Sequence, residues 1–203
     1  ARAVAAEESG EVYVAGFAAM AAVGNADIWF NKYDGNGRPL WSNPVMVGGS
    51  AGGFDRANAL AMDTAGRIYV AGFVSETGES TNAWLHQYNP DGTALWPEPV
   101  TYNGMDNLAD EGNGVAVDEE ENIYLTGVES RLDEGPNLWA QKYDPEGVPL
   151  WPEPISYNSS GTLADVGRDI AVDAEGAIYI IGDQMAVGQN TNLLVAKYTC
   201  SGE

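Results

Sequence analysis

The sequence predicts an all-β protein, a β-propeller of four repeated, four-stranded blades in which the last blade is incomplete. The first observation is a period: equivalent aromatic residues recur at intervals of 55 or 56 residues along the whole chain. The second is that each repeat holds short runs rich in Val, Ile, Tyr and Trp, bounded by Gly, Pro, Asn and Asp. The third is that no segment sustains a helical period. The aromatic series are Tyr13, Tyr69, Tyr124 and Tyr179; Tyr33, Tyr88, Tyr143 and Tyr198; and Trp41, Trp96 and Trp151.

The period divides residues 1–203, a single domain or propeller segment, into repeats of about 1–56, 57–111, 112–166 and 167–203. Each repeat contains up to four strand-like segments, which we label A to D. Segment A is Ala3–Glu7, Ala59–Asp63, Gly114–Asp118 and Asp169–Asp173; B is Val12–Gly16, Ile68–Gly72, Ile123–Gly127 and Ile178–Gly182. Segment C is Ile28–Tyr33, Trp84–Tyr88, Leu138–Tyr143 and Leu193–Tyr198; D starts at Leu40, Leu95 and Leu150.

The A–B and C–D connections are predicted to be tight turns. Asp63–Gly66 and Asp173–Gly176 begin with Asp and end with Gly, the pattern of a type I turn followed by a left-handed residue. Such acidic turns suggest calcium loops, but each has too few ligands, so plain hairpin turns are expected. In the third repeat Glu121 replaces the glycine, so Glu121 or Asn122 must adopt a positive φ.

Segments D and A are expected at opposite edges of each sheet. Trp96–Pro99 and Trp151–Pro154 place two prolines in segment D, which therefore fits only an outer edge. Segment A instead carries small residues at equivalent positions, suited to a crowded centre: Ala5, Ala61, Ala116 and Ala171. This arrangement is that of propeller blades. The tryptophans of the third aromatic series are expected to pack between blades.

The repeat also resembles a known family. Asp…Gly-x-Ile-Tyr-Val-x-Gly, then Lys-Tyr-Asp-Pro-x-Gly, then Leu-Trp is similar to the SBBP-type bacterial β-propeller repeat, and the resemblance spans all four copies. It implies a propeller of a secreted or cell-surface protein, so the expected location is extracellular. It supplies no catalytic residue.

The last repeat stops before its D segment, which leaves ring closure open. The chain could close as a four-bladed ring, pair with a second chain into eight blades, or be a segment of a longer polypeptide, and we favour the last arrangement. Cys200 is the only cysteine and is expected to be a free thiol near the end of the chain.

Charge excludes two classes of partner. The chain carries nine Lys and Arg against 30 Asp and Glu, a net charge of −21. Nucleic acids and anionic membranes require clustered basic residues, so neither is an expected partner. No apolar run approaches the length of about 18 residues that membrane insertion needs. The acidity is compatible with cation binding.

The candidate site lies on the face where the B–C and D–A connections emerge, because these are the long and variable loops. The B–C loops are Ala18–Ala26, Val74–Asn82, Glu129–Asn137 and Gln184–Asn192, and the D–A loops include Tyr102–Asp106 and Tyr157–Gly161. Asp55, Asp110 and Asp165 recur in the D–A loops and enter the innermost strands. They would bind Ca²⁺ or another hard cation, the only cofactor considered, or each would accept backbone N–H bonds and fix its own loop.

Catalytic signals are weak. His86 is the only histidine, its equivalents are Asn31, Gln141 and Ala196, and it is expected to be a packing residue. The sequence has no phosphate loop and no CxxC pair. We therefore expect a non-enzymatic extracellular module that binds a protein or glycan ligand through the B–C and D–A loop face. The alternatives are a structural component built of like subunits, and a propeller hydrolase or lyase.

Overall fold

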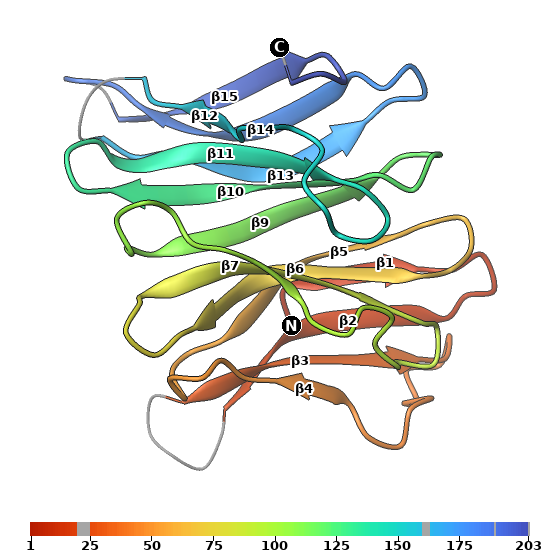
Figure 1. The fold of residues 1–203 in the computed structure, drawn as a ribbon. Helices are drawn as coiled ribbons and strands as arrows, with labels where there is room; N and C mark the ends of the chain where they lie inside the picture. Colours follow the sequence, from red (N-terminus) through yellow and green to blue (C-terminus); the bar gives the residue numbers. More distant parts are fainter. Residues whose placement is uncertain (20–24, 160–162, 189, 203) are drawn as a thin grey trace.

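The computed structural model describes residues 1–19, 25–159, 163–188 and 190–202. The predicted loops Ala18–Ala26, Gln184–Asn192 and Tyr157–Gly161 therefore lie partly outside the described residues. The described residues form fifteen strands and no helix (Figure 1). None of these segments provides a helix long and apolar enough to cross a membrane.

The strands form four separate antiparallel sheets, each made from strands that are consecutive in the chain. Sheet I contains β1 (Ala3–Ala6), β2 (Val12–Ala19), β3 (Ala26–Tyr33) and β4 (Val45–Val47). Sheet II contains β5 (Arg56–Met62), β6 (Ile68–Ser75), β7 (Thr81–Tyr88) and β8 (Val100–Tyr102). Sheet III contains β9 (Asp110–Val117), β10 (Ile123–Arg131), β11 (Gly135–Tyr143) and β12 (Ile155–Tyr157). Sheet IV contains β13 (Asp165–Val172), β14 (Ile178–Met185) and β15 (Thr191–Tyr198).

The sheets follow one another in a propeller-like arrangement, from sheet I in red to sheet IV in blue (Figure 1). The first strands of neighbouring sheets contact each other, β1 with β5, β5 with β9, and β9 with β13. The short strands β4, β8 and β12 lie at the opposite edge of their sheets. The all-β prediction is confirmed, as are the inner position of segment A and the edge position of segment D.

Each pair of consecutive sheets encloses its own hydrophobic core. Between sheets II and III, Leu85 and Trp96 pack with Leu125 and Trp139, and both leucines are almost completely buried. The Trp96 indole donates a hydrogen bond to the Pro145 carbonyl in the next sheet, at 3.0 Å. The predicted packing of Trp41, Trp96 and Trp151 between sheets is confirmed, because each joins one of the three cores.

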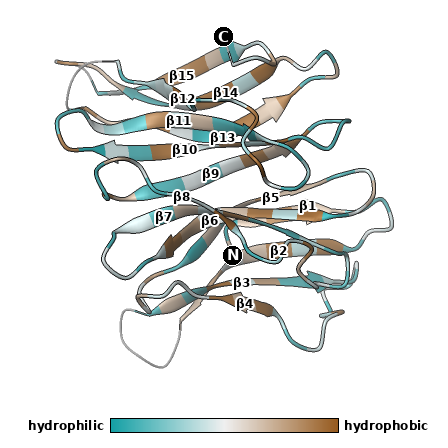
Figure 2. Ribbon diagram, in the orientation of Figure 1, coloured by the Kyte–Doolittle hydropathy of each residue, from teal (hydrophilic) through white to brown (hydrophobic). Residues whose placement is uncertain are grey.

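The outer face of sheet I and the outer face of sheet IV are not covered by a neighbouring sheet. Figure 2 shows apolar residues in brown along strands of all four sheets. On sheet IV, however, Leu193 and Val195 are 76% and 61% exposed. One repeat earlier, Leu138 and Ala140 are completely buried against sheet IV. At the other end Val4 of sheet I is 68% exposed.

The predicted start of segment D is wrong. Strand β8 begins at Val100 and β12 at Ile155, after the second proline of each Trp-Pro-Glu-Pro motif, and the prolines lie in the preceding bend. Proline fixes its own φ, lacks an N–H and restricts the residue before it, so two prolines at alternate positions prevent ladder pairing.

The inner strands are longer than predicted and contain an irregularity. Strands β5, β9 and β13 begin several residues before the predicted A segments, and their register with the second strand shifts at Asn58, Asn113 and Arg168. Opposite this shift lies a glycine such as Gly127, where an added Cβ would collide with the Glu111 carbonyl. In the third A–B turn, where Glu121 replaces the expected glycine, Glu121 itself adopts the positive φ, 68°.

Candidate functional site

The three aspartates predicted as metal ligands act as clamps within separate sheets. The Asp55 side chain is completely buried and accepts backbone hydrogen bonds from Gly49 at 2.7 Å and Ser75 at 2.6 Å. Gly49 belongs to the D–A loop and Ser75 ends β6, where the B–C hairpin begins. One buried carboxylate therefore joins the two connections that form the predicted functional face.

The same clamp recurs in the next two sheets. Asp110 accepts from the Gly104 and Ser130 amides at 2.5 and 3.0 Å. Asp165 accepts from the Ser159 and Met185 amides at 2.5 and 3.2 Å, and also from the Ser159 hydroxyl at 2.8 Å. This is the geometry of the loop-fixing alternative.

The calcium hypothesis stays a prediction. Across the part of the chain that the structure describes, no three His, Cys, Asp or Glu side chains gather into a group suited to a metal ion. Asp55, Asp110 and Asp165 are thus not brought together into one ligand set. Burial raises the pKa of Asp110 to about 6, with the negative charge of Glu129 contributing, against the opposing effect of its two backbone hydrogen bonds.

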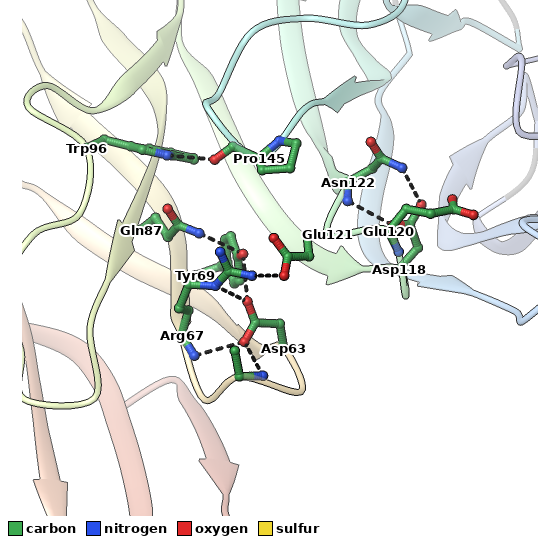
Figure 3. A network of polar contacts seen from close by, with 11 residues as sticks. Asp63, Arg67, Tyr69, Gln87, Trp96, Asp118, Glu120, Glu121, Asn122 and Pro145 are labelled. Atoms are coloured by element: carbon green, nitrogen blue, oxygen red, sulfur yellow. Dashed lines mark hydrogen bonds and ion pairs between the residues drawn. The ribbon is translucent and has the colours of Figure 1, made fainter.

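The opposite face is built from turn-fixing acids (Figure 3). Asp63 accepts hydrogen bonds from the Ala65 and Arg67 amides, both at 2.9 Å, and from the Tyr69 hydroxyl at 3.0 Å. Arg67 also pairs with Glu121 of sheet III and so links two neighbouring sheets. Asp118 and Asp173 repeat the bond to the strand tyrosine. The acidic turns therefore have the hairpin role that the sequence predicts.

A polar cavity of about 370 Å³ lies where the inner strands begin, at their D–A loop ends. Side chains from all four sheets line it, and every one of them is on or directly before an inner strand. Beside Ala1, they are Arg2, Arg56, Asn58, Glu111, Asn113 and Arg168. We call this the central cavity.

Hydrogen bonds across the sheets order the lining of the central cavity. The Asn113 amide group donates to the Gly167 carbonyl at 3.0 Å, and the Asn58 amide group donates to the Asn113 side-chain oxygen at 3.1 Å. The Asn58 oxygen in turn accepts from Arg56 Nε at 2.6 Å. Arg56 is thus held at the end of a chain of bonds that begins in sheet IV.

The electrostatics of the central cavity contrast with those of the chain. Burial lowers the pKa of Arg56, and the nearby positive charge of Arg2 lowers it further, while Glu111 partly opposes both effects. The Arg56–Glu111 contact is long, 3.5 Å. Arg168 forms an ion pair with Asp183 at 2.6 Å.

The sequence analysis did not predict the central cavity, although the sequence contains a repeated pattern that indicates it. Asn58, Asn113 and Arg168 are spaced by 55 residues, and Arg2 stands 56 before Asn58. A polar position repeated in the inner strand of each unit, next to the small residues of segment A, indicates side chains directed at a shared centre.

His86 is a packing residue, as the sequence predicts. It is buried, and its ring lies beside Trp84, Tyr88 and Trp96 at centroid distances of 4.8 to 5.9 Å. Burial lowers its pKa to about 4, so the ring is neutral at physiological pH. It lies among aromatic side chains and does not line the central cavity.

Comparison with known proteins shows the fold alone. No protein-family model matches the chain, and no curated protein matches it by sequence. Among solved structures, it is similar to a protein of unknown function from Dyadobacter fermentans, with a TM-score of 0.65 and 11% identity over 98% of this chain. The chain spans 65% of the length of that protein. A gluconolactonase from Xanthomonas campestris aligns with a TM-score of 0.30 and 15% identity, over 77% of this chain and 65% of its own.

Proposed function

We propose that the four sheets are blades of a β-propeller, and that the chain is a non-enzymatic binding module whose ligand enters the face formed by the D–A loops and B–C hairpins. The observation that carries the proposal is the repeated aspartate clamp around the central cavity. Asp55, Asp110 and Asp165 each lock a loop to a hairpin in the free protein, so little ordering entropy is left to lose on binding. The central cavity, at the D–A loop ends of the inner strands, offers concave polar space for a ligand.

The extracellular location belongs to this proposal. Its support is the resemblance of the repeat to SBBP-type propellers of secreted and cell-surface proteins. A protein or glycan ligand, or a small molecule derived from either, fits a binding module in that location.

A blocking variant tests the proposal without assuming the chemistry of the ligand. The chain would be screened by thermal shift against neutral oligosaccharides, acidic sugars, small carboxylates, phosphates and short peptides. We expect at least one class to raise the melting temperature, because a ligand bound only to the folded state stabilises it. Arg168→Trp, which places a bulky side chain at the central cavity, should abolish the shift, and Arg38→Trp in an exposed turn should not.

Two outcomes would contradict the binding proposal. The first is that no class of compound shifts the melting temperature. The second is that a shift survives in Arg168→Trp, which would place the ligand elsewhere on the molecule.

The second candidate function is a structural component made of like subunits. Its specific support is the pair of uncovered faces, at Val4 on sheet I and at Leu193 and Val195 on sheet IV. Sedimentation of the chain over a range of concentrations tests it. Self-association that Leu193→Glu removes would favour this function, and a monomer at every concentration would refute it.

A further inference from the structure

We propose that the central cavity is an anion site that takes a small ligand bearing carboxylate or phosphate groups. This inference rests on the proposed function and specifies the chemistry of its ligand. Its argument uses the distribution of the arginines, their preorganisation and the local balance of charge.

The arginines are concentrated at the central cavity. The chain has six arginines in all, and three of them, Arg2, Arg56 and Arg168, line this one cavity. They come from three different sheets, so no single local motif places them together. The chain carries a net charge of −21, but the three guanidinium groups that line this cavity of about 370 Å³ form a local cluster of positive charge.

The acidic partners do not neutralise this group. Arg56 has Glu111 at 3.5 Å and Arg168 has Asp183, while Arg2 forms no ion pair with any described residue. These five side chains therefore sum to one net positive charge. Because Arg2 and Arg56 repel each other, an anion between them would relieve an interaction that is unfavourable in the free protein.

Arg56 is prepared for such a ligand. Its Nε is held by Asn58, and its guanidinium lies over the Phe73 ring with its carbon 4.9 Å from the centroid. Apart from the long contact of Nη2 with Glu111 at 3.5 Å, the terminal N–H groups remain available, and these match the paired oxygens of a carboxylate or phosphate. Replacement of Asn58 would loosen Arg56 without removing any charge.

The size of the central cavity and the charge of the chain limit the ligand to a small molecule. A volume of about 370 Å³ is at the lower end of small-molecule sites. A long polyanion is disfavoured because the chain as a whole carries a net charge of −21, which repels the part of such a ligand that lies outside the cavity. An acidic monosaccharide, a small dicarboxylate or a phosphate monoester fits both limits.

The test is titration calorimetry with four probes: glucuronate, glucose as its neutral match, malonate and inorganic phosphate. We expect glucuronate, malonate or phosphate to bind and glucose not to bind, with affinity falling as salt is added. The carboxylates and phosphate are separate arms, so their order of affinity identifies which oxyanion the site prefers.

Variants assign the binding to the arginines. Arg56→Gln and Arg168→Gln should each weaken the binding of the best probe by about tenfold or more, as expected for loss of a charge-assisted bond. Arg38→Gln, in the exposed C–D turn, is the matched control and should leave affinity unchanged. Arg168 is exposed, so its variant remains informative if Arg56→Gln fails to fold.

Three results would overturn the anion site: no anionic probe binds, glucose binds as well as glucuronate, or both glutamine variants keep full affinity. The proposed function fails separately. If a neutral ligand binds and Arg168→Trp blocks it, the binding module stands and the anion site does not.

Discussion

Replacing Asp55 by alanine should destabilise the protein strongly, although no ligand or active site is involved. The buried carboxylate accepts two backbone hydrogen bonds, from Gly49 and Ser75. A hydrogen bond to a charged group contributes about 1.5–3 kcal/mol, and truncation leaves both N–H donors without their partner. Water replaces part of this loss because the donors are only partly buried, so we expect the free energy of unfolding to fall by about 3 kcal/mol. Asp55→Asn keeps one acceptor oxygen and should lose about half as much.

Urea unfolding, followed with and without calcium and with EDTA, measures the effect of Asp55. The loop-fixing role predicts the same loss under all three conditions. Asp91→Ala, in an exposed C–D turn, is the control and should cost much less. A loss below about 0.5 kcal/mol for Asp55→Ala would refute the reasoning, since that is the size of ordinary surface substitutions. Stabilisation of the parent chain by calcium that Asp55→Ala, Asp110→Ala and Asp165→Ala remove would instead support the calcium hypothesis.

Three other predictions follow from the repeat. Leu85→Ala, between sheets II and III, should lower the free energy of unfolding in urea by about 2–4 kcal/mol. Val195→Ala, at the equivalent but uncovered position of sheet IV, should lower it by less than about 0.5 kcal/mol. Equal losses for the two variants would contradict the assigned interfaces. Gly127→Ala should cost about 1–3 kcal/mol because its Cβ meets the Glu111 carbonyl, and an unchanged melting temperature would be inconsistent with this contact. The raised pKa of Asp110 means that the folded state binds a proton more tightly than the unfolded state between about pH 4 and pH 6. The stability that Asp110 contributes therefore falls as pH rises through this window, and the difference in unfolding free energy between the parent and Asp110→Asn should be larger at pH 4 than at pH 7; a constant difference would refute it.

The fold could be predicted from the sequence because each repeat shows the same structural pattern again. One Asp-to-Gly turn is weak evidence, but the turn ending at Gly66 recurs at Gly176, between strands of matching pattern. The limits of segment D were missed for a local reason. Composition marks where residues favour an edge. After single bridges at Ala94 and Pro149, continuous pairing begins only where N–H groups are again free to bond, beyond Pro99 and Pro154.

The site was less predictable because it depends on contacts between repeats. The sequence indicated that Asp55 enters an inner strand, but the two roles considered for it, cation ligand and acceptor of backbone N–H bonds, use the same carboxylate oxygens. Only its hydrogen bonds to Gly49 and Ser75 show what the carboxylate does in this fold. The grouping of Arg2, Arg56 and Arg168 depends on how the inner strands converge, which the period does not specify.

The cores between the sheets have a consequence for how such a chain can gain or lose repeats in evolution. Each core joins the same repeat positions, for example Phe30 of sheet I with the face of sheet II that holds Trp84, and Leu85 of sheet II with the face of sheet III that holds Trp139. Deleting residues 57–111 would bring the Phe30 face against the Trp139 face, which is already shaped for such a neighbour. Whole repeats can therefore be gained or lost by recombination without new interface residues. The number of sheets is then set by the number of repeats within the gene, while the proposed ligand site changes with each inner strand that is added or removed.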